Sequence, residues 1–499
     1  MSANNNKQTV FLTGASGGMG KEVMREILTR SDRFILRILV RPSQKNKDMM
    51  KDFENNPALE IVWGDMTNYE NVLECVTGAD YVLHVGAFVS PMADNDPQQC
   101  IDINYGSTRY IIRAVKEQEN ADEIGVVYIG TVAETGCRRP PIHWGRCGDP
   151  IKGSIFDYYA VSKIASERAI IESGLKKWVS LRQTGILPAT AVKDPIMFHQ
   201  PLGNVLEWVT AYESGILMAN ICEDWVPDSF WRKIYNIGGD PSFRVTCAQY
   251  FTDMYKPMKL SIRDIFEPQW FARFNFHGQF YTDSDKLNDI LKFRKMTYQQ
   301  YIERVQNEMA MAFSSPEAAA QMPTADQMLE KNRALARMPR GPLWMLEDNH
   351  PDWLNAFYGG KDAVASMSKN WDDYNPSVPD MTPAYLNHGY DENKDFEKLD
   401  ISDMKAAAEY RGGTCLSSVT GSIYEPLKWK CTFGHKFEAS PNLVLKGGHW
   451  CPECERKAWN YSEIAQRNPF FNQVWEPLHS PDETYSITKK VNDLSLRNK

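Results

Sequence analysis

The sequence predicts an α/β fold in which a parallel, doubly wound sheet comes first and a small module organised by cysteines comes last. Three observations carry this prediction. Short apolar runs that favour β-structure alternate with segments of helical length in the first part of the chain. A glycine-rich turn joins the first of these runs to a helix. Four of the ten cysteines lie between residues 415 and 454.

Length, charge and hydropathy narrow the class of protein. A chain of 499 residues is too long for one ordinary core and predicts two to three domains. The formal net charge of -8 argues against a protein devoted to nucleic acid or to an anionic membrane. The N-terminal "MSANNNKQTV" is too polar for a secretory signal, and no apolar stretch reaches the roughly 20 residues that span a bilayer. We therefore expect a cytoplasmic protein that uses neither nucleic acid nor membrane as a partner.

The first element is a strand, a tight turn and a helix in "QTVFLTGASGGMGKEVMREILTR". Gly14, Gly17 and Gly20 are spaced by three, with Gly18 as an additional glycine. Residues without Cβ let the backbone approach a pyrophosphate, and the helix N-terminus offers it free N–H groups. This turn predicts nucleotide binding.

The second strand, "FILRILV", is followed by Arg41, with Lys45 and Lys47 nearby and no carboxylate before Asp48. An acidic residue at this point would bind the ribose hydroxyls, whereas an arginine suits a 2′-phosphate. The sequence thus favours NADP(H) and leaves NAD(H) as the alternative. Further strands are expected in "LEIVWGD", "ADYVLHVGA" and "IGVVYIGT", which gives the alternating pattern of a parallel sheet.

The stretch "YYAVSK" places Tyr159 and Lys163 one helical turn apart, in a helix expected to end at Gly174. A nearby ammonium favours the ionised phenol, so we expect Lys163 to lower the pKa of Tyr159 from its usual value near 10. The same spacing recurs at four other Tyr/Lys pairs. The surrounding motifs must therefore decide whether this pair is catalytic.

From about residue 8 to 310 the chain resembles the extended or atypical branch of the short-chain dehydrogenase/reductase family, of the NAD-dependent epimerase/dehydratase kind. Six motifs occur in the family's order: "TGASGGMG", "GDMTN", "HVGAFVSP", "NYGST", "YIGTVAETG" and "YYAVSK". The resemblance implies a Rossmann-type sheet with a smaller substrate-binding part, located mainly at 190–310. It implies an NAD(P)-dependent oxidoreductase.

The resemblance also implies roles for individual residues. Thr131 would orient the substrate oxygen, Tyr159 would exchange a proton with it, and Lys163 would hold the nicotinamide ribose. The residues implied to bind the cofactor are Gly14, Ser16, Gly17, Gly18, Met19, Gly20, Arg41, Asp65, Met66, Gly86, Ala87, Asn104, Tyr159, Lys163 and Ile186.

Departures from the family pattern bear on the reaction. Sugar-nucleotide dehydratases follow the catalytic threonine with an Asp-Glu pair, whereas this chain continues with Val132 and Ala133 and has Glu134 one place later still. The substrate part is rich in large apolar side chains, and only Arg232, Lys233 and Arg244 present themselves as cations for a diphosphate. The sequence therefore favours a small, moderately apolar substrate whose carbonyl and secondary alcohol are interconverted. A sugar-nucleotide epimerase with tightly bound NAD, and a nucleotide-sensing regulator with a zinc interaction module, remain alternatives.

Cysteines and one histidine near the C-terminus have the spacing of a metal site. Cys451 and Cys454 form a C-x-x-C, and Cys431 lies one hairpin length upstream. His435 and Cys415 compete for the fourth position. The stretch resembles a zinc ribbon or treble clef, which implies a structural zinc ion because four protein ligands leave no open coordination position.

The domain organisation follows from these motifs. Residues 1–310 form the NAD(P)-binding domain, 311–410 a helical and irregular connecting segment that wraps it, 411–465 the zinc-binding module, and 466–499 a C-terminal tail. We expect the zinc-binding module to serve docking or dimerisation, and the protein to be a homo-oligomer such as a dimer.

Overall fold

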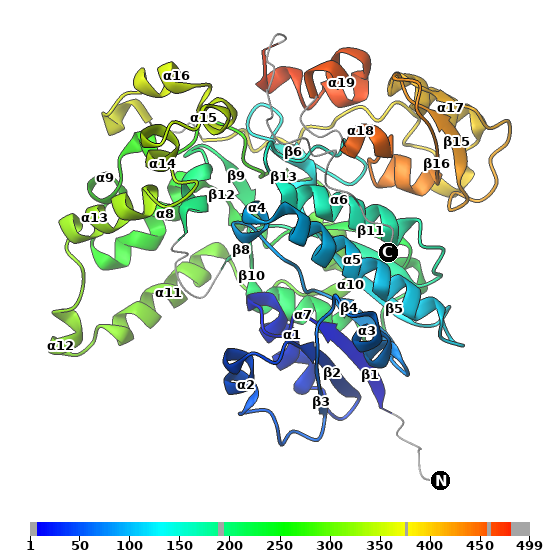
Figure 1. The fold of residues 1–499 in the computed structure, drawn as a ribbon, viewed down its shortest axis with the longest axis horizontal. Coiled ribbons are helices and arrows are strands. Elements are labelled where there is room, and N and C mark those ends of the chain that lie inside the picture. Colours follow the sequence, from blue (N-terminus) through cyan, green and yellow to red (C-terminus); the bar gives the residue numbers. More distant parts are fainter. Residues whose placement is uncertain (1–6, 188–193, 375–377, 457–460, 481–499) are drawn as a thin grey trace.

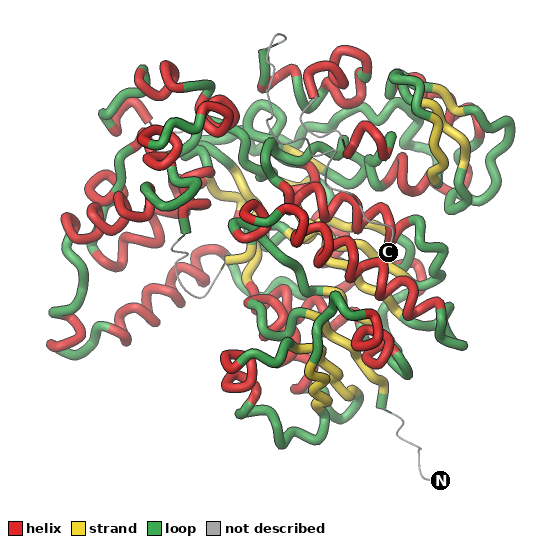
Figure 2. The backbone as a smooth tube through the Cα atoms, in the orientation of Figure 1, coloured by secondary structure: helices red, strands yellow, loops and turns green. Residues whose placement is uncertain are grey.

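In the computed structural model of the chain, residues 7–187, 194–374, 378–456 and 461–480 are described. Their centre is a seven-stranded sheet in which every neighbouring pair is parallel (Figures 1 and 2). In spatial order the strands are β11 (Lys233–Ile237), β7 (Trp178–Gln183), β5 (Gly125–Thr131), β4 (Tyr81–His84), β1 (Gln8–Thr13), β2 (Phe34–Val40) and β3 (Leu59–Trp63). The central strands β4, β5 and β7 are buried at every position, as expected for a sheet covered on both faces.

The order of the strands reverses between β1 and β4. In open parallel sheets, ligands bind at such a point, outside the carboxyl ends of the strands. Gly14 follows β1 and Gly86 follows β4, so the two motifs expected to approach the cofactor meet at this point. The predicted α/β, doubly wound fold is confirmed.

Helices cover both faces of the sheet. One face packs against α1 (Gly18–Leu28), α2 (Gln44–Met50), α7 (Ala211–Ile221) and α10 (Ser284–Leu291). The other packs against α3 (Tyr69–Val76), α5 (Pro97–Lys116) and α6 (Tyr158–Ile171). The Asp157 carboxylate accepts a hydrogen bond from the Ala160 amide at the start of α6. The chain turns away after α6 at Gly174, whose φ is +77°.

The substrate part consists of three small two-stranded sheets and the helices around them. The strand pairs are β8 (Ile186–Leu187) with β10 (Val209–Thr210), β9 (Val205–Glu207) with β12 (Arg244–Thr246), and β6 (Trp144–Gly145) with β13 (Phe280–Tyr281). The helices of this part are α8 (Cys247–Tyr255), α9 (Ile262–Ile265) and α11 (Tyr298–Ala312); α4 (Met92–Asn95) precedes α5. Residues 188–193, where this part was expected to begin, lie outside the described residues.

The connecting segment contains α12 (Pro316–Ala319), α13 (Ala325–Ala336), α14 (Pro342–Glu347), α15 (Pro351–Tyr358) and α16 (Lys361–Ala365). Its apolar side chains share two cores with earlier parts of the chain. Met328 packs with Phe198 and Trp270, and Phe357 packs in the cluster that contains Phe156. These helices lie beside the substrate part in Figure 1, so the segment covers the first domain without a core of its own.

The C-terminal module packs against the same face of the sheet as α6. It contains the antiparallel strands β14 (Thr414–Cys415), β15 (Leu427–Lys430) and β16 (Lys436–Ala439), and α18 (Pro452–Arg456). The last helix of the connecting segment, α17 (Ile401–Tyr410), packs in the same core. Within the stretch expected as a tail lie the end of α19 (Tyr461–Arg467) and all of α20 (Pro469–Asn472), in which Phe470 and Phe471 are buried. Residues 457–460, between α18 and α19, lie outside the described residues. No helix among the described ranges has both the length and the apolar character that crossing a membrane requires.

Candidate active site and candidate metal centre

The glycine-rich turn is a tightly packed piece of backbone. Gly14 has φ +78°, and a Cβ built on it would lie 2.6 Å from the Gly86 Cα. A Cβ on Gly20 would lie 2.0 Å from the Gly14 carbonyl oxygen, whereas a Cβ on Gly18 would meet nothing within 4 Å. Gly14 and Gly20 therefore hold β1, β4 and α1 together. Gly17 caps α1 without a side chain, which leaves the first amides of the helix free for an anion.

A groove of about 650 Å³ opens at the point where the strand order reverses. The predicted cofactor-binding residues that line it are Gly14, Ser16, Gly17, Gly18, Met19, Gly20, Arg41, Asp65, Met66, Gly86, Ala87, Tyr159, Lys163 and Ile186. Thr131 lines it as well. Residues from five of the six motifs thus share one cavity large enough for a nucleotide.

Arg41 lies where the groove reaches the end of β2. Its side chain is exposed, and its backbone carbonyl accepts a hydrogen bond from the Asn46 amide group. The Asp65 carboxylate accepts hydrogen bonds from the Thr67 amide and hydroxyl on its Oδ1, at 2.9 and 2.8 Å. Among the described residues at this end of the groove, Arg41 is the charged side chain that can pair with a phosphate.

The predicted catalytic side chains meet at the other end of the groove. Tyr159 lies beside Thr131, which ends β5 and whose hydroxyl favours the ionised form of the phenol and so lowers its pKa. Lys163 is 3% exposed, and its Nζ lies 4.3 Å from the centre of the Tyr128 ring. Thr131 comes from the sheet and the other two from α6, so the spacing of "YYAVSK" and the packing of α6 on β5 together bring the three groups into one place.

Asn104 does not line the groove. It accepts a hydrogen bond from the Phe88 amide at 2.7 Å and donates to the Phe88 carbonyl and to the Ser162 hydroxyl. It therefore ties the segment that follows β4 to α6, behind the cofactor-binding surface.

The prediction that Lys163 lowers the pKa of Tyr159 below its usual value is wrong for the chain without a bound ligand. Burial raises the pKa of the Tyr159 phenol above its usual value, and the neighbouring Thr131 hydroxyl only partly opposes this. Burial also lowers the pKa of Lys163, to about 8, against the opposing influence of Glu134. The physical reason is that both groups lie in the protein interior, where loss of water outweighs their interaction with neighbouring charges.

Sequence reasoning noted Glu134 only as a departure from the family pattern, and the structure gives it a place. Its Oε1 accepts a hydrogen bond from the Thr131 amide at 3.0 Å, and its Oε2 lies 3.3 Å from the Nε of Arg182. Arg182 in turn pairs with Glu167 at 2.7 Å. All three side chains are buried directly behind the groove and none of them lines it. Charged residues inside strands and helices that are otherwise fully buried are the one signal that could have found this cluster.

Two of the three substrate-part cations already have partners. Arg244 pairs with Glu207 at 2.8 Å, and the Arg232 guanidinium lies 3.4 Å from the centre of the Tyr424 ring. Lys233 is exposed at the start of β11. None of the three lines the groove. The groove near Tyr159 is lined instead by Phe88, Val89 and Ile196, together with the polar side chains of Gln183 and Thr184.

The C-terminal cluster has the dimensions of a tetrahedral site. His435 Nδ1 lies 3.4 Å from Cys431 Sγ and 3.5 Å from the Sγ atoms of Cys451 and Cys454, and the sulfurs of Cys431 and Cys454 are 3.9 Å apart. Zinc–sulfur bonds of about 2.3 Å and zinc–nitrogen bonds of about 2.0–2.1 Å in a tetrahedron place sulfur and nitrogen about 3.6 Å apart, and two sulfurs about 3.8 Å apart. The side chains present therefore fit a zinc ion.

The structure distinguishes the two residues that competed for the fourth position. His435 belongs to the group of four, whose ligand atoms all lie within 4.8 Å of one another. Cys415 does not belong to it. It is buried on β14, in the core that this module shares with α3 and α5.

Comparison with known proteins agrees with this geometry. Residues 10–182 match the model of the "NAD dependent epimerase/dehydratase family". A UDP-glucose 4-epimerase from Rickettsia massiliae is 32% identical over 111 residues, which cover 21% of this chain and 32% of that protein. The corresponding protein of Rickettsia bellii is 30% identical over the same length and coverage. The chain thus spans about a third of the length of the curated relatives it matches.

A solved structure shows the same fold. DesIV, a dTDP-glucose 4,6-dehydratase from Streptomyces venezuelae with NAD and TYD bound, has a TM-score of 0.50 and 16% sequence identity. The match covers 62% of this chain and 98% of that one. The six motifs, the reversed strand order and the family-model match lead to one conclusion: residues 10–182 of this chain are similar to the NAD-dependent epimerase/dehydratase family and form most of a Rossmann-type sheet.

Proposed function

We propose that the protein is an NAD(P)-dependent oxidoreductase of the short-chain dehydrogenase/reductase type that interconverts a carbonyl and a secondary alcohol. The observation that carries the proposal is the meeting of Thr131, Tyr159 and Lys163 at one end of the groove that begins at the glycine-rich turn. The residues present fit a dinucleotide, because the free amides at the start of α1 suit its phosphates and Gly14 and Gly86 leave room for close backbone approach.

The bound nicotinamide supplies the hydride chemistry. The protein supplies the proton, since the oxygen of a carbinol must lose or gain one as its carbon is oxidised or reduced. Tyr159 exchanges that proton, Thr131 orients the oxygen through its hydroxyl, and the Lys163 ammonium stabilises the phenolate form of Tyr159. Because burial raises the pKa of Tyr159, its neutral form predominates, which suits proton donation to a carbonyl oxygen.

We propose NADP(H) as the preferred cofactor. Arg41 lines the groove with its side chain free, and the nearest carboxylate, Asp65, is engaged by Thr67. A guanidinium in this position pairs with a 2′-phosphate in a geometry that a ribose hydroxyl does not match.

The lining of the groove supports a small, moderately apolar substrate. Phe88, Val89 and Ile196 supply apolar surface near Tyr159, whereas the cations expected for a diphosphate lie elsewhere. A dehydratase is disfavoured because Glu134 is turned toward Arg182 and the Thr131 amide, away from the groove.

A second candidate is a sugar-nucleotide epimerase with tightly bound NAD. The curated relatives that match residues of the N-terminal domain are UDP-glucose 4-epimerases, which favours this candidate. Such an enzyme oxidises and re-reduces the same carbinol, so it needs the same three side chains but consumes no net cofactor.

For the C-terminal module we propose a structural zinc ion held by Cys431, His435, Cys451 and Cys454. Four protein ligands close the coordination sphere, so the ion would stabilise the module and take no part in the reaction. A fragment of this size has little other means of fixing its loops.

The test is a titration of the purified chain with NADPH and NADH, followed by absorbance of the reduced nicotinamide while ketones, steroids and sugar nucleotides are added. We expect net consumption of NADPH that Tyr159→Phe abolishes. Tyr158→Phe is the matched control, because it removes a phenol hydroxyl from the same helix at a residue that does not line the groove. Interconversion of a sugar nucleotide without net consumption would replace this proposal by the epimerase. Tight cofactor binding with no turnover of any substrate would argue for a sensor.

A further inference from the structure

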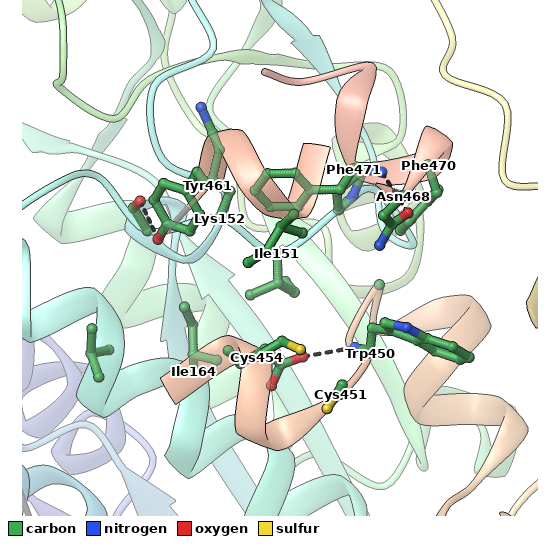
Figure 3. A pocket seen from close by; sticks show the side chains of 16 residues that line it. Ile151, Lys152, Ile164, Trp450, Cys451, Cys454, Tyr461, Asn468, Phe470 and Phe471 are labelled. Atoms are coloured by element: carbon green, nitrogen blue, oxygen red, sulfur yellow. Dashed lines mark hydrogen bonds between the residues drawn. The ribbon is translucent and has the colours of Figure 1, made fainter. Parts of the chain in front are cut away.

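The C-terminal module and helix α6 share one apolar core. Ile170 of α6 and Trp178 of β7 belong to the same cluster of buried residues as Trp429, Leu443 and Cys451 of the module. A second contact is drawn in Figure 3, where Ile151 and Ile164 of the first part of the chain line one small cavity of about 50 Å³ together with Cys454, Tyr461 and Phe471. The module is thus packed on the helix that carries Tyr159 and Lys163.

A row of polar contacts runs along the edge of this interface. Arg168 on α6 donates to the Trp450 carbonyl at 2.7 Å and to both oxygens of Glu455. Further along α6, the Glu172 carboxylate accepts hydrogen bonds from the hydroxyl and the amide of Ser440. These contacts fix the module against α6 at two separate points.

Beneath this row, the module completes a buried ionic cluster. Arg182 donates to both oxygens of Glu167, at 3.1 and 2.7 Å, and also to the backbone carbonyl of Gly447 at 2.6 Å. His449 Nε2 lies 2.9 Å from Glu167 Oε2. Arg182, Glu167 and His449 are each at most 1% exposed. Two of the contacts in this cluster therefore come from residues more than 260 positions away in the sequence.

The cluster contacts both halves of the proposed active site. On one side, Arg182 is paired with Glu134, whose other oxygen holds the Thr131 amide. On the other side, Glu167 lies one helical turn after Lys163 on α6. A buried charge keeps one position only while each of its hydrogen-bonding partners is present, since an unpaired charge in the interior is costly.

We propose that Gly447 and His449 of the C-terminal module position Thr131 and Lys163 by completing the coordination of Arg182 and Glu167. The module is then a part of the active site and not an appended domain. Its four-ligand centre has the role of holding the loop of residues 447–450 in place, since Cys451 directly follows that loop. Arg182, Glu167 and His449 are positioning residues, because none of them lines the groove. The inference rests on the proposed function for its kinetic consequence and on geometry alone for its structural consequence.

The experiment measures hydrogen exchange and kinetics in the full-length, zinc-loaded chain. His449→Ala removes a hydrogen bond to a charged group. We expect it to speed amide exchange about tenfold in the peptides that cover residues 129–136 and 160–168. The rescue variant is His449→Gln, whose side-chain N–H can replace that of the imidazole, and it is expected to restore slow exchange. Ser440→Ala is the matched control, because it removes hydrogen bonds from the same interface without touching Arg182 or Glu167.

The kinetic arm uses the same variants with whichever carbonyl substrate proves active. His449→Ala and Glu167→Gln are expected to lower kcat by about 10- to 100-fold, as for a misplaced catalytic group, with the cofactor KM within threefold of the original. Unchanged exchange in residues 129–136 in both variants, at a zinc content of one per chain, would overturn the inference. So would full kcat in His449→Ala while Tyr159→Phe is inactive, a result that leaves the proposed function intact. If no substrate is turned over at all, the proposed function fails and the exchange data alone decide the positioning role.

Discussion

Replacement of Arg182 by methionine is expected to destabilise the protein strongly, because methionine keeps most of the volume of the side chain and removes its charge. Glu167 and Glu134 would then be two carboxylates at 0% exposure without a cation between them. Breaking a buried ion pair by removing one partner costs about 3 to 5 kcal/mol, a large part of the roughly 5 to 15 kcal/mol that separates folded from unfolded proteins.

Urea unfolding followed by tryptophan fluorescence measures this loss. With a slope of about 3 kcal/mol per molar urea, the midpoint is expected to fall by roughly 1 to 1.7 M. The control is Arg304→Met on α11, whose partner Glu308 lies at an equally short distance of 2.8 Å but whose side chain is 56% exposed. That substitution is expected to cost less than about 0.5 kcal/mol.

The effect of Arg182→Met on stability should also depend on pH, in a direction that the pKa of Glu167 sets. Burial opposes the ionisation of Glu167, yet Arg182 and His449 hold the pKa of this carboxyl below its usual range. Its contribution to stability is therefore present above the usual carboxyl pKa and is lost as the pH falls through the lowered value. In Arg182→Met, Arg182 no longer lowers the pKa of Glu167. The difference in the free energy of unfolding between the original protein and the variant should therefore shrink toward acid pH. A loss below about 1 kcal/mol at pH 7, or a difference that grows on acidification, would refute the reasoning.

Three further predictions concern the cofactor, the lysine and the metal. Arg41→Ala should weaken NADPH binding about tenfold and leave NADH binding nearly unchanged, as measured by quenching of protein fluorescence; Lys45→Ala serves as the control because Lys45 does not line the groove, and equal weakening of both cofactors would contradict the assignment. Activity should fall as the pH rises through about 8, because the ammonium of Lys163 is lost there, and a profile that is flat up to pH 10 would count against its role. The same lowered pKa makes the contribution of Lys163 to stability unfavourable below pH 8, and this penalty disappears as the pH rises toward the ordinary lysine value. Cys451→Ser should lower the zinc content, measured by atomic emission, from one per chain to a small fraction, while Cys415→Ser should leave it at one.

Local patterns were sufficient to predict the sheet and the cofactor groove. Each of the first five strands of the chain is a short apolar run followed by a turn or a loop, and the glycines that follow β1 have a spacing that steric packing requires. The cysteine module was predictable for the same reason, since Cys451, Cys454 and the preceding hairpin are close in sequence. The order of the motifs also predicted that Thr131 and Tyr159 belong to one site, which the spacing of residues alone does not predict.

Contacts between distant segments were not predictable in this way. Arg182 stands in "WVSLRQ", where alternation suggests a strand with one exposed face, yet all six residues are buried. Its partners Gly447 and His449 carry no pattern that refers to it. The prediction for the pKa of Tyr159 was wrong for a related reason, because the sequence shows the neighbouring cation and does not show that the phenol is withdrawn from water in the wall of the groove. The helices of the connecting segment were obscure because their apolar faces pack on other segments and are short.

Residues near the C-terminal end cover α6, so this packing cannot form until late in the synthesis of the chain. Arg182 and Gly447 are separated by 265 residues, and a ribosome that adds about 5 to 20 residues per second needs roughly 15 to 50 seconds to make that stretch. During this time Arg182 and Glu167 lack two of their partners, and apolar residues such as Trp178 lie on an open face. The nascent sheet cannot complete its packing until the C-terminal module has been synthesised. A fragment that ends at residue 310 would leave this apolar face exposed permanently. We expect such a fragment to aggregate and not to fold by itself.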